Sequence, residues 1–270
     1  FPTIRVLETT DFHGAILPAT RDRRTGRAVG GSAVLAAHIA RLRGENPEGT
    51  VLIDGGDWYQ GTMISNLSFG RPVIEQMNAL GYAAAAVGNH EFDWTADTLI
   101  RRIREFRGAA LGANVRVIRT GRRPDWAKSD TIVTRRGARI GVLGLCYPET
   151  PTVTLARHVA HLRFEDDSAT AVPLVERLRK KDRVDAVIGL GHVPGRSDSG
   201  RGVGGDLGRL VRGVKGVDAW FGGHSHNVVL GENGGIPGMI AGAHAEWIAV
   251  CDLVLDPIGD RVIERRSRID

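Results

Sequence analysis

The sequence has few cysteines and no long apolar run, and each of these two features excludes a class of protein. Cys146 and Cys251 are the only cysteines among 270 residues, too few for a disulfide framework. Both lie in apolar, strand-like runs, so we predict two buried thiols, with a single bridge between them as the alternative. No stretch approaches the roughly 18 apolar residues of a membrane helix. The sequence therefore predicts no membrane span.

Lysine is also scarce, and this shapes the charge of the chain. The formal net charge is +5 and lysine occurs at four positions, so arginine supplies nearly all of the positive charge. The arginines are scattered and not interleaved with aromatic residues, unlike those of a nucleic-acid-binding surface. We therefore expect no nucleic-acid partner. The arginine-rich loop at 21–27 is interpreted as solvated, with attraction of anionic substrates as the alternative.

Predicted strands and helices alternate along the chain, with β-hairpins between them. The strands are expected at 4–10, 50–53, 83–87, 184–190 and 217–221. The helices are expected at 32–43, with Ser32 as N-cap, and at 73–80, 95–106, 168–181 and 206–214. Hairpins are expected from 130–135 with 139–145, and from 247–255 with 261–265. This pattern predicts an α/β sandwich with mixed sheets. Because no linker or repeat interrupts it, we predict a single domain over residues 1–270.

Five of the apolar runs end in a cluster of polar residues. The clusters are Asp11-x-His13, Gly56-Asp57, Gly88-Asn89-His90-Glu91, Gly191-His192 and Gly223-His224-Ser225-His226. In α/β sheets, ligands collect beyond the carboxyl ends of the strands. If these strands are neighbours, the clusters converge on one crevice. The glycines let the backbone turn sharply and approach a bound ligand.

The converging side chains form a set of nitrogen and oxygen donors without a thiolate. The set is Asp11, His13, Asp57, Asn89, His192, His224 and His226. Imidazole and carboxylate together favour Zn, Mn or Fe over an all-oxygen Ca or Mg site. Seven donors are too many for one tetrahedral ion, but they suit two ions that share a carboxylate. Paired divalent ions recur in phosphatases, where they activate water and neutralise phosphoryl oxygens. The sequence therefore predicts a phosphoester hydrolase with two divalent metal ions as cofactors.

Two further residues are candidates for proton transfer. His90 is adjacent to Asn89 and is placed to act as general acid or as a donor near the leaving oxygen. Asp93 follows three residues later and is expected to hold the ring of His90 and keep it protonated.

The ordered motifs resemble those of the calcineurin-like metallophosphatases. They are Asp-x-His at 11–13, Gly-Asp-x-x-Gln-Gly at 56–61, Gly-Asn-His-Glu-Phe-Asp at 88–93, Gly-His at 191–192 and Gly-His-Ser-His at 223–226. The third motif looks specifically like the 5'-nucleotidases and their bacterial 2',3'-cyclic phosphodiesterase relatives. The resemblance extends along almost the whole chain. It implies a four-layer α/β/β/α sandwich with two mixed sheets, which agrees with the alternation of predicted elements.

The resemblance also implies roles for these residues. It places Asp11, His13 and His226 on one metal ion. It places Asn89, His192 and His224 on the other, with Asp57 as bridge. His90 and Asp93 match the family's catalytic pair. Other polar residues are assigned no chemical role: Glu91, Asp54 and Gln60 are expected to be structural, and His38, His158, His161 and His244 to be ordinary surface or loop residues.

The implied reaction is hydrolysis of phosphate monoesters, with nucleoside 5'-monophosphates as the expected substrates. The alternatives are a 2',3'-cyclic nucleotide phosphodiesterase or general phosphodiesterase, a thiosulfohydrolase, and an inactive metal-containing binding domain. Family members with nucleotidase activity usually carry a C-terminal substrate-binding domain, which these 270 residues lack, so the native protein is expected either to continue into one or to be a single-domain relative. The chain begins at Phe1, which indicates removal of a preceding segment, by a signal peptidase or by deliberate shortening. Together with the resemblance, this favours export to the periplasm or the extracellular space.

Overall fold

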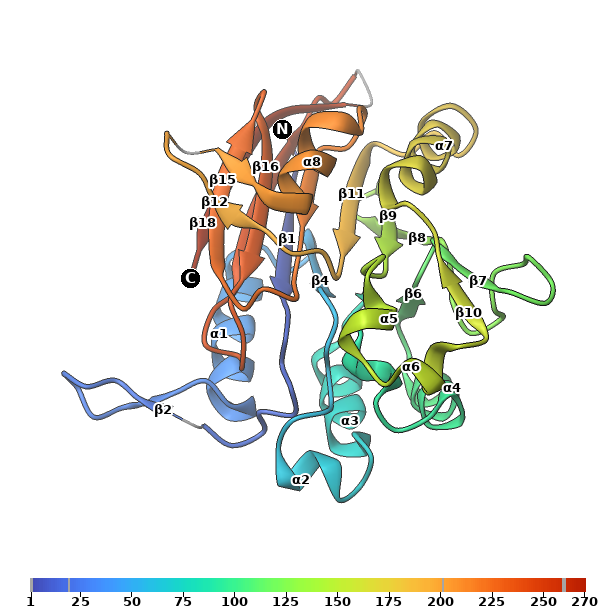
Figure 1. The fold of residues 1–270 in the computed structure, drawn as a ribbon. Coiled ribbons are helices and arrows are strands. Elements are labelled where there is room, and N and C mark those ends of the chain that lie inside the picture. Colours follow the sequence, from blue (N-terminus) through green and yellow to red (C-terminus); the bar gives the residue numbers. More distant parts are fainter. Residues whose placement is uncertain (1, 19, 201, 259–260) are drawn as a thin grey trace.

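Two six-stranded mixed sheets form the centre of the molecule (Figure 1). The computed structural model describes the chain except for residues 1, 19, 201 and 259–260. The first sheet has the order β18-β17-β1-β4-β5-β6. Its strands are β1 (Thr3–Thr9), β4 (Thr50–Asp54), β5 (Ala84–Ala86), β6 (Ala109–Leu111), β17 (Ala249–Leu255) and β18 (Val262–Ile269).

The second sheet has the order β15-β16-β14-β11-β9-β8. Its strands are β8 (Asp130–Arg135), β9 (Ala138–Leu145), β11 (Ala186–Gly191), β14 (Ala219–Phe221), β15 (Val228–Asn233) and β16 (Ile236–Ala241). In each sheet four neighbouring strands run parallel, and antiparallel strands lie at the margins.

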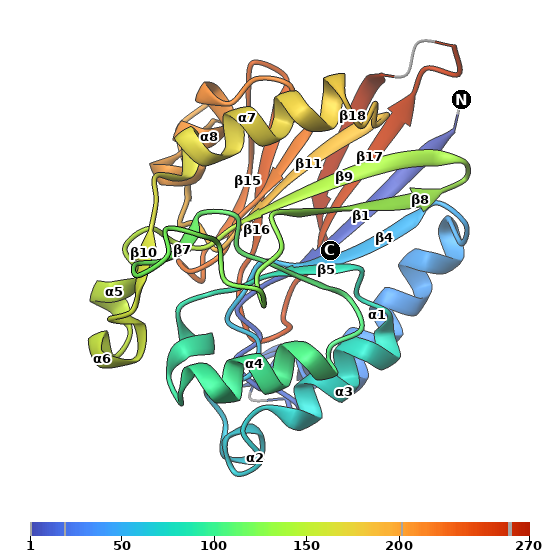
Figure 2. The same ribbon diagram turned by 90° about the vertical axis from the view of Figure 1, so that its right-hand side faces the viewer.

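Helices cover the outer face of each sheet, which makes the molecule a four-layer sandwich (Figure 2). Helices α1 (Ser32–Glu45), α3 (Arg71–Leu80) and α4 (Ala96–Glu105) pack on the first sheet, and α7 (Asp167–Lys180) and α8 (Gly205–Gly213) on the second. On β1, Val6 faces the second sheet and Leu7 faces the helices. Strands buried on both faces need apolar residues at every position, and β4 is buried throughout. The α/β/β/α prediction is confirmed.

The parallel strands decide where the polar clusters meet. β1 is parallel to β4, and β4 to β5, so their carboxyl ends share one edge of the first sheet. β11 is parallel to β14 in the second sheet. The two sheets pack face to face through one apolar layer. All five predicted clusters therefore leave the same edge of the sandwich.

Short elements complete the chain. They are the strand pairs β2 (Thr20–Arg21) with β3 (Ala28–Val29), β7 (Val115–Val117) with β10 (Leu162–Phe164), and β12 (Arg196–Ser197) with β13 (Val203–Gly204), the 3-10 turn η1 (His90–Phe92), and helices α2 (Met63–Asn66), α5 (Thr150–Val153) and α6 (Ala156–Val159). Across the described residues, no helix is both long enough and apolar enough to pass through a lipid bilayer. Cys146 and Cys251 are buried and unpaired, as predicted.

One local expectation was wrong, and one hairpin was not predicted. Ser32 is the first residue of α1 and Gly31 is its N-cap; the Ser32 hydroxyl donates to the Gln76 side chain instead. The hairpin of β15 and β16 was missed. Gly231, Pro237 and Gly238 weaken its strand signal, since glycine and proline are disfavoured in strands.

Candidate metal centre

Most of the predicted ligands have an unusual backbone conformation. Left-handed φ angles occur at Asp11 (50°), His13 (49°), Asp57 (58°), His224 (67°) and His226 (55°). Such angles are uncommon outside glycine, and they cluster at functional sites. Each of these residues follows a strand end closely. The turns therefore direct the side chains back over the common edge of the two sheets.

Three side chains form what we call the outer group: Asp11, His13 and His226. The Nε2 atoms of His13 and His226 are 3.0 Å apart, and His226 Nε2 lies 3.4 Å from Asp11 Oδ1. His13 Nδ1 donates to the carbonyl of Gln60 at 2.8 Å, which leaves the Nε2 lone pair of the neutral ring free to bind a cation. Gln60 thus acts through its backbone. Asp11 and His13 are buried, whereas the His226 side chain is 45% exposed.

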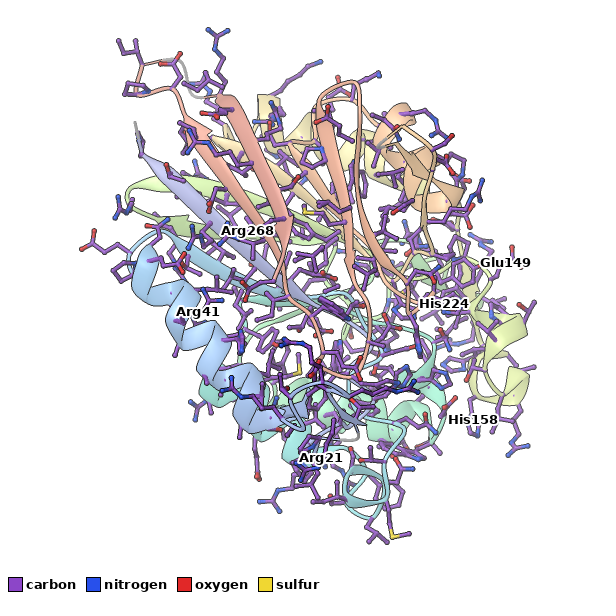
Figure 3. All side chains as sticks on the ribbon, turned by 90° about the vertical axis from the view of Figure 1, so that its left-hand side faces the viewer. Arg21, Arg41, Glu149, His158, His224 and Arg268 are labelled. Atoms are coloured by element: carbon purple, nitrogen blue, oxygen red, sulfur yellow. The ribbon has the colours of Figure 1, made fainter. Side chains whose placement is uncertain are left out.

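Four side chains form the inner group: Asp57, Asn89, His192 and His224. His192 Nε2 lies 3.0 Å from Asp57 Oδ2 and 3.1 Å from Asn89 Oδ1. His224 Nδ1 lies 2.9 Å from the same Asn89 oxygen. His192 Nδ1 donates to the carbonyl of Gly55 at 2.9 Å, so its Nε2 lone pair also faces inward. Figure 3 shows His224 at the loop end of the second sheet.

The donor separations fit a pair of cations. Ligands about 2.0–2.2 Å from one ion lie roughly 3–3.5 Å from each other, and most contacts within each group are in this range. Asp57 Oδ2 faces both groups, because it lies 3.0 Å from His192 Nε2 and 3.8 Å from His13 Nε2. The residues present therefore suit two divalent ions with a carboxylate between them.

The electrostatics of the inner group indicate a place for positive charge. Burial lowers the pKa of His192, but the Asp57 carboxylate raises it, for a net rise to about 10. Burial and the charge on His192 lower the pKa of His224 to about 4. Burial opposes ionisation of Asp57, yet His192 holds its pKa below the usual range. Without a cation, a proton on His192 balances Asp57, so cation binding must displace that proton.

His90 and Asp93 form a close pair beside the outer group. His90 Nδ1 lies 2.5 Å from Asp93 Oδ2, and the His90 ring centroid is 5.1 Å from that of His13. Thr154 Oγ1 donates to the other Asp93 oxygen at 2.8 Å. Burial lowers the pKa of His90, but the hydrogen bond to Asp93 raises it, and the net shift is upward. Asp93 therefore orients the ring and favours its protonated form.

Glu91 fixes the two loops that carry the inner group. It is fully buried, and its carboxylate accepts the backbone N–H groups of Asp57, Trp58 and Gly88 at 2.9, 2.7 and 2.7 Å. These donors come from the loops after β4 and β5. The expectation that Glu91 is structural agrees with this geometry.

Asp54 and His158 also support the site without entering it. The Asp54 carboxylate accepts Thr9 Oγ1 at 2.6 Å and the Gly56 N–H at 2.9 Å, as expected for a side chain that is not a ligand. His158 was expected to be an ordinary loop residue, but its Nδ1 lies 2.8 Å from the carbonyl of Phe92. In Figure 3 it lies on the same side of the molecule as His224. It therefore braces the turn that carries His90 and Asp93.

Two residues at the site were missed from the sequence. His244 is in a loop, as expected, and its ring lies 5.5 Å from the rings of both His13 and His226. The Tyr147 ring lies 4.5 Å from that of His224. They follow the ends of β16 and β9, which are parallel strands of the second sheet. The rule that found the other clusters would have found His244 if β16 had been predicted. His38 and His161 are exposed, and His38 pairs with Asp270 at 3.2 Å.

Comparison with known proteins decides the family. The calcineurin-like phosphoesterase family matches residues 4–228. The chain belongs to this family. The chain is 32% identical to the 5'-nucleotidase of Bos taurus in an alignment 241 residues long, which covers 85% of this chain and 39% of the relative. It is 26% identical to the 2',3'-cyclic-nucleotide 2'-phosphodiesterase/3'-nucleotidase of Yersinia enterocolitica in an alignment 284 residues long, gaps included, which covers 94% of this chain and 43% of that protein.

Comparison with a solved structure shows that the fold is shared as well. The chain superposes on the 5'-nucleotidase precursor of Thermus thermophilus with a TM-score of 0.85 at 25% identity. The match covers 99% of this chain and 54% of the other. The chain thus spans about two fifths of the two relatives named above and about half of this structure. These proteins contain chain beyond the matched domain.

Proposed function

We propose that this domain hydrolyses phosphate monoesters, with nucleoside 5'-monophosphates as the substrate class. One observation carries the proposal: seven nitrogen and oxygen donors from five strand ends meet in two groups, and Asp57 faces both. In this proposal Asp11, His13 and His226 hold one divalent ion, and Asn89, His192 and His224 hold the other. The likeness to 5'-nucleotidases supports the choice of substrate.

The bound ions would supply a water of lowered pKa and neutralise charge on the phosphoryl oxygens. The protein supplies the rest of the chemistry. Backbone carbonyls of Gly55 and Gln60 fix the ring nitrogens of His192 and His13. Glu91 locks the loop of Asp57 to the loop of Asn89. The donors are therefore placed before substrate arrives, which lowers the cost of reorganisation during reaction.

His90 is the proposed proton donor. Its Nδ1 is committed to Asp93, so Nε2 is the nitrogen that can donate to a phosphoryl oxygen or to the leaving oxygen. The raised pKa keeps more of the ring protonated near neutral pH, which a proton donor requires. Asp93 acts through His90 and is a positioning residue.

A cyclic-nucleotide phosphodiesterase is the second candidate, because a relative bears that name. The same metal centre would serve either reaction, so substrate choice must be measured. We also propose that the native protein pairs this domain with a second, substrate-binding domain, and that it is exported. The matched residues make up 39% of the bovine relative, which supports the second domain. Fractionation of the native source would test export.

The test of function is a panel of phosphoesters assayed with and without added Mn²⁺, Zn²⁺ or Fe²⁺. AMP, p-nitrophenyl phosphate, 2',3'-cyclic AMP and bis-p-nitrophenyl phosphate separate monoesterase from diesterase. We expect chelator-sensitive hydrolysis, fastest with monoesters, and two ions per chain by elemental analysis. The product measured is phosphate for AMP and p-nitrophenyl phosphate, p-nitrophenol for the bis-p-nitrophenyl ester, and nucleoside monophosphate for cyclic AMP. Preference for the diesters would favour the second candidate. Two bound ions without turnover of any ester would favour a binding domain.

A further inference from the structure

A histidine that belongs to neither donor group lies at the open edge of the centre. Among the described residues, the candidate ion-binding trios are Asp11 with His13 and His226, and Asp57 with His192 and His224. His244 is in neither, although its ring lies 5.5 Å from those of His13 and His226. It is exposed, whereas its neighbours from Ala241 to Ala245 are buried. Its ring nitrogens are therefore available to a molecule that binds over the outer group.

The backbone holds His244 in a strained conformation. Its φ is 58° and that of Ala245 is 60°, so two successive residues other than glycine occupy the left-handed region. Such strain persists only where the surroundings impose it, and it clusters at ligand-binding sites. Here the His244 N–H donates to the carbonyl of Asp11 at 2.8 Å. This bond ties the turn to the loop that carries a predicted ligand.

The outer side of the turn is fixed as well. The carbonyl of His244 approaches Gly30 so closely that a Cβ there would lie 2.6 Å from it. Thr20 Oγ1 donates to Glu246 at 3.0 Å. The backbone is thus confined between Asp11 and Gly30 while the ring stays exposed. This combination of a rigid backbone and an accessible imidazole suits recognition of a ligand.

We propose that His244 contacts the substrate and donates a hydrogen bond to a phosphoryl oxygen held at the outer group. This inference rests on the proposed function. The His13 ring has both His90 and His244 as neighbours, at 5.1 and 5.5 Å between ring centroids. The two imidazoles come from different sheets, His90 after β5 and His244 after β16. A phosphoryl group over His13 would therefore meet a donor from each sheet.

The strain offers a sharp test, because glycine adopts these φ angles freely. We compare His244→Gly with Ala245→Gly, which relieves the same kind of strain one residue later and keeps the imidazole. Neither variant is expected to lower the melting temperature of the metal-loaded protein. His244→Gly should raise the KM for AMP and the dissociation constant of inorganic phosphate about tenfold or more, as loss of a hydrogen bond to a charged group does. Ala245→Gly should leave both constants near those of the wild type.

The outcomes separate this inference from the proposed function. Equal KM and phosphate affinity in the two variants would show that His244 is a bystander. Loss of an ion from His244→Gly, seen by elemental analysis, would show a role in holding the centre instead. Asparagine tolerates a left-handed backbone, so His244→Asn repeats the test without the added backbone flexibility of glycine. A wild-type protein that binds two ions but neither hydrolyses esters nor binds phosphate would overturn both proposals.

Discussion

The inner and outer groups each contain one aspartate and two histidines, and the inner group adds Asn89, but the two groups differ in depth. His192 and Asp57 are buried, whereas the His226 side chain of the outer group is 45% exposed. Glu91 ties the two loops of the inner group together with backbone hydrogen bonds. The outer group borders the exposed His244. We infer that the inner group fixes the centre, and that the outer group faces substrate and exchanges its ion more readily.

The most severe way to break this arrangement is to remove the residue that both groups share. We expect Asp57→Asn to lose ions from both groups, because an amide cannot balance two cations. Turnover should fall by more than the roughly 10²–10⁴-fold that loss of a general acid costs. Elemental analysis and phosphate release measure the two effects. Asp54→Asn is the matched control, because it makes the same chemical change three residues away and should keep both ions.

The difference in depth predicts unequal ion affinities. His192→Ala should abolish binding at the inner group and disturb the outer one, whereas His226→Ala should lose the outer ion and retain the inner one. Each should lower turnover by more than the roughly 10–100-fold typical of residues that only support a ligand. Stepwise chelation of the wild type should proceed in two phases, with the His226→Ala protein showing only the slower. A single phase in the wild type would argue against the proposed inequality.

Ion affinity should also depend on pH, with a definite sign. The pKa of His192 is raised to about 10, so this ring carries a proton at neutral pH when no cation is bound. Binding a cation releases that proton, and affinity therefore rises with pH up to that region. Calorimetric titration in buffers of different ionisation enthalpy would count the protons released. A release of about one proton at neutral pH as the inner group of the wild type binds its ion would support this sign, and binding without proton release would contradict it.

There is a physical reason why some residues of the centre were predicted from the sequence and others were missed. Asp11, His192 and His224 were found because each follows an apolar run with a clear strand pattern. His244 and Tyr147 were missed for different reasons. The strand before His244 contains Pro237 and Gly238, and the run before Tyr147 was interpreted as part of a hairpin, whose end carries no expectation of a ligand. Support by Glu91 and His158 depends on backbone contacts between distant loops, and residue type carries no signal for these.

Substitutions at His90 test the comparison of the two groups further, since His90 lies beside the outer group without belonging to it. His90→Ala should keep both ions and reduce kcat by about 10²–10⁴-fold. Asp93→Asn should reduce it less, because the ring remains. Asp93 raises the pKa of His90, so its loss should move the alkaline limb of the kcat/KM profile to lower pH. Asp97→Asn, a nearby exposed change, should leave the profile in place. Loss of an ion from His90→Ala would contradict its assignment as a donor.

The smallest expected effect is on the stability of the fold, and it concerns the strands that lead to the two groups. Each has a buried acid near its end: Glu8 on β1 leads to the outer group, and Asp54 on β4 leads to the inner one. Asp54 accepts two hydrogen bonds, whereas neither oxygen of Glu8 makes a well-formed one. Burial raises the pKa of Glu8 well above its ordinary value, and the charges of Asp54 and Asp11 raise it further. The carboxylate on the strand that leads to the outer group is therefore the less stabilised of the two in its ionised form.

This contrast predicts effects of different size for two similar substitutions. The unfolded chain releases the Glu8 proton near pH 4.5, while the folded protein keeps it to higher pH, so the free energy of unfolding falls as pH rises above that point. Glu8→Gln removes this loss and should raise the free energy of unfolding by about 1–3 kcal/mol at pH 7. Burial also raises the pKa of Asp54, to about 7, so Asp54→Asn removes a similar loss but gives up an acceptor, and it should raise the free energy of unfolding less than Glu8→Gln does. Urea unfolding at several pH values, with exposed Glu48→Gln as control, measures both. If Glu8→Gln were destabilising, Glu8 would have to be an ionised and stabilised part of the centre, and the outer group would be better supported than its geometry indicates.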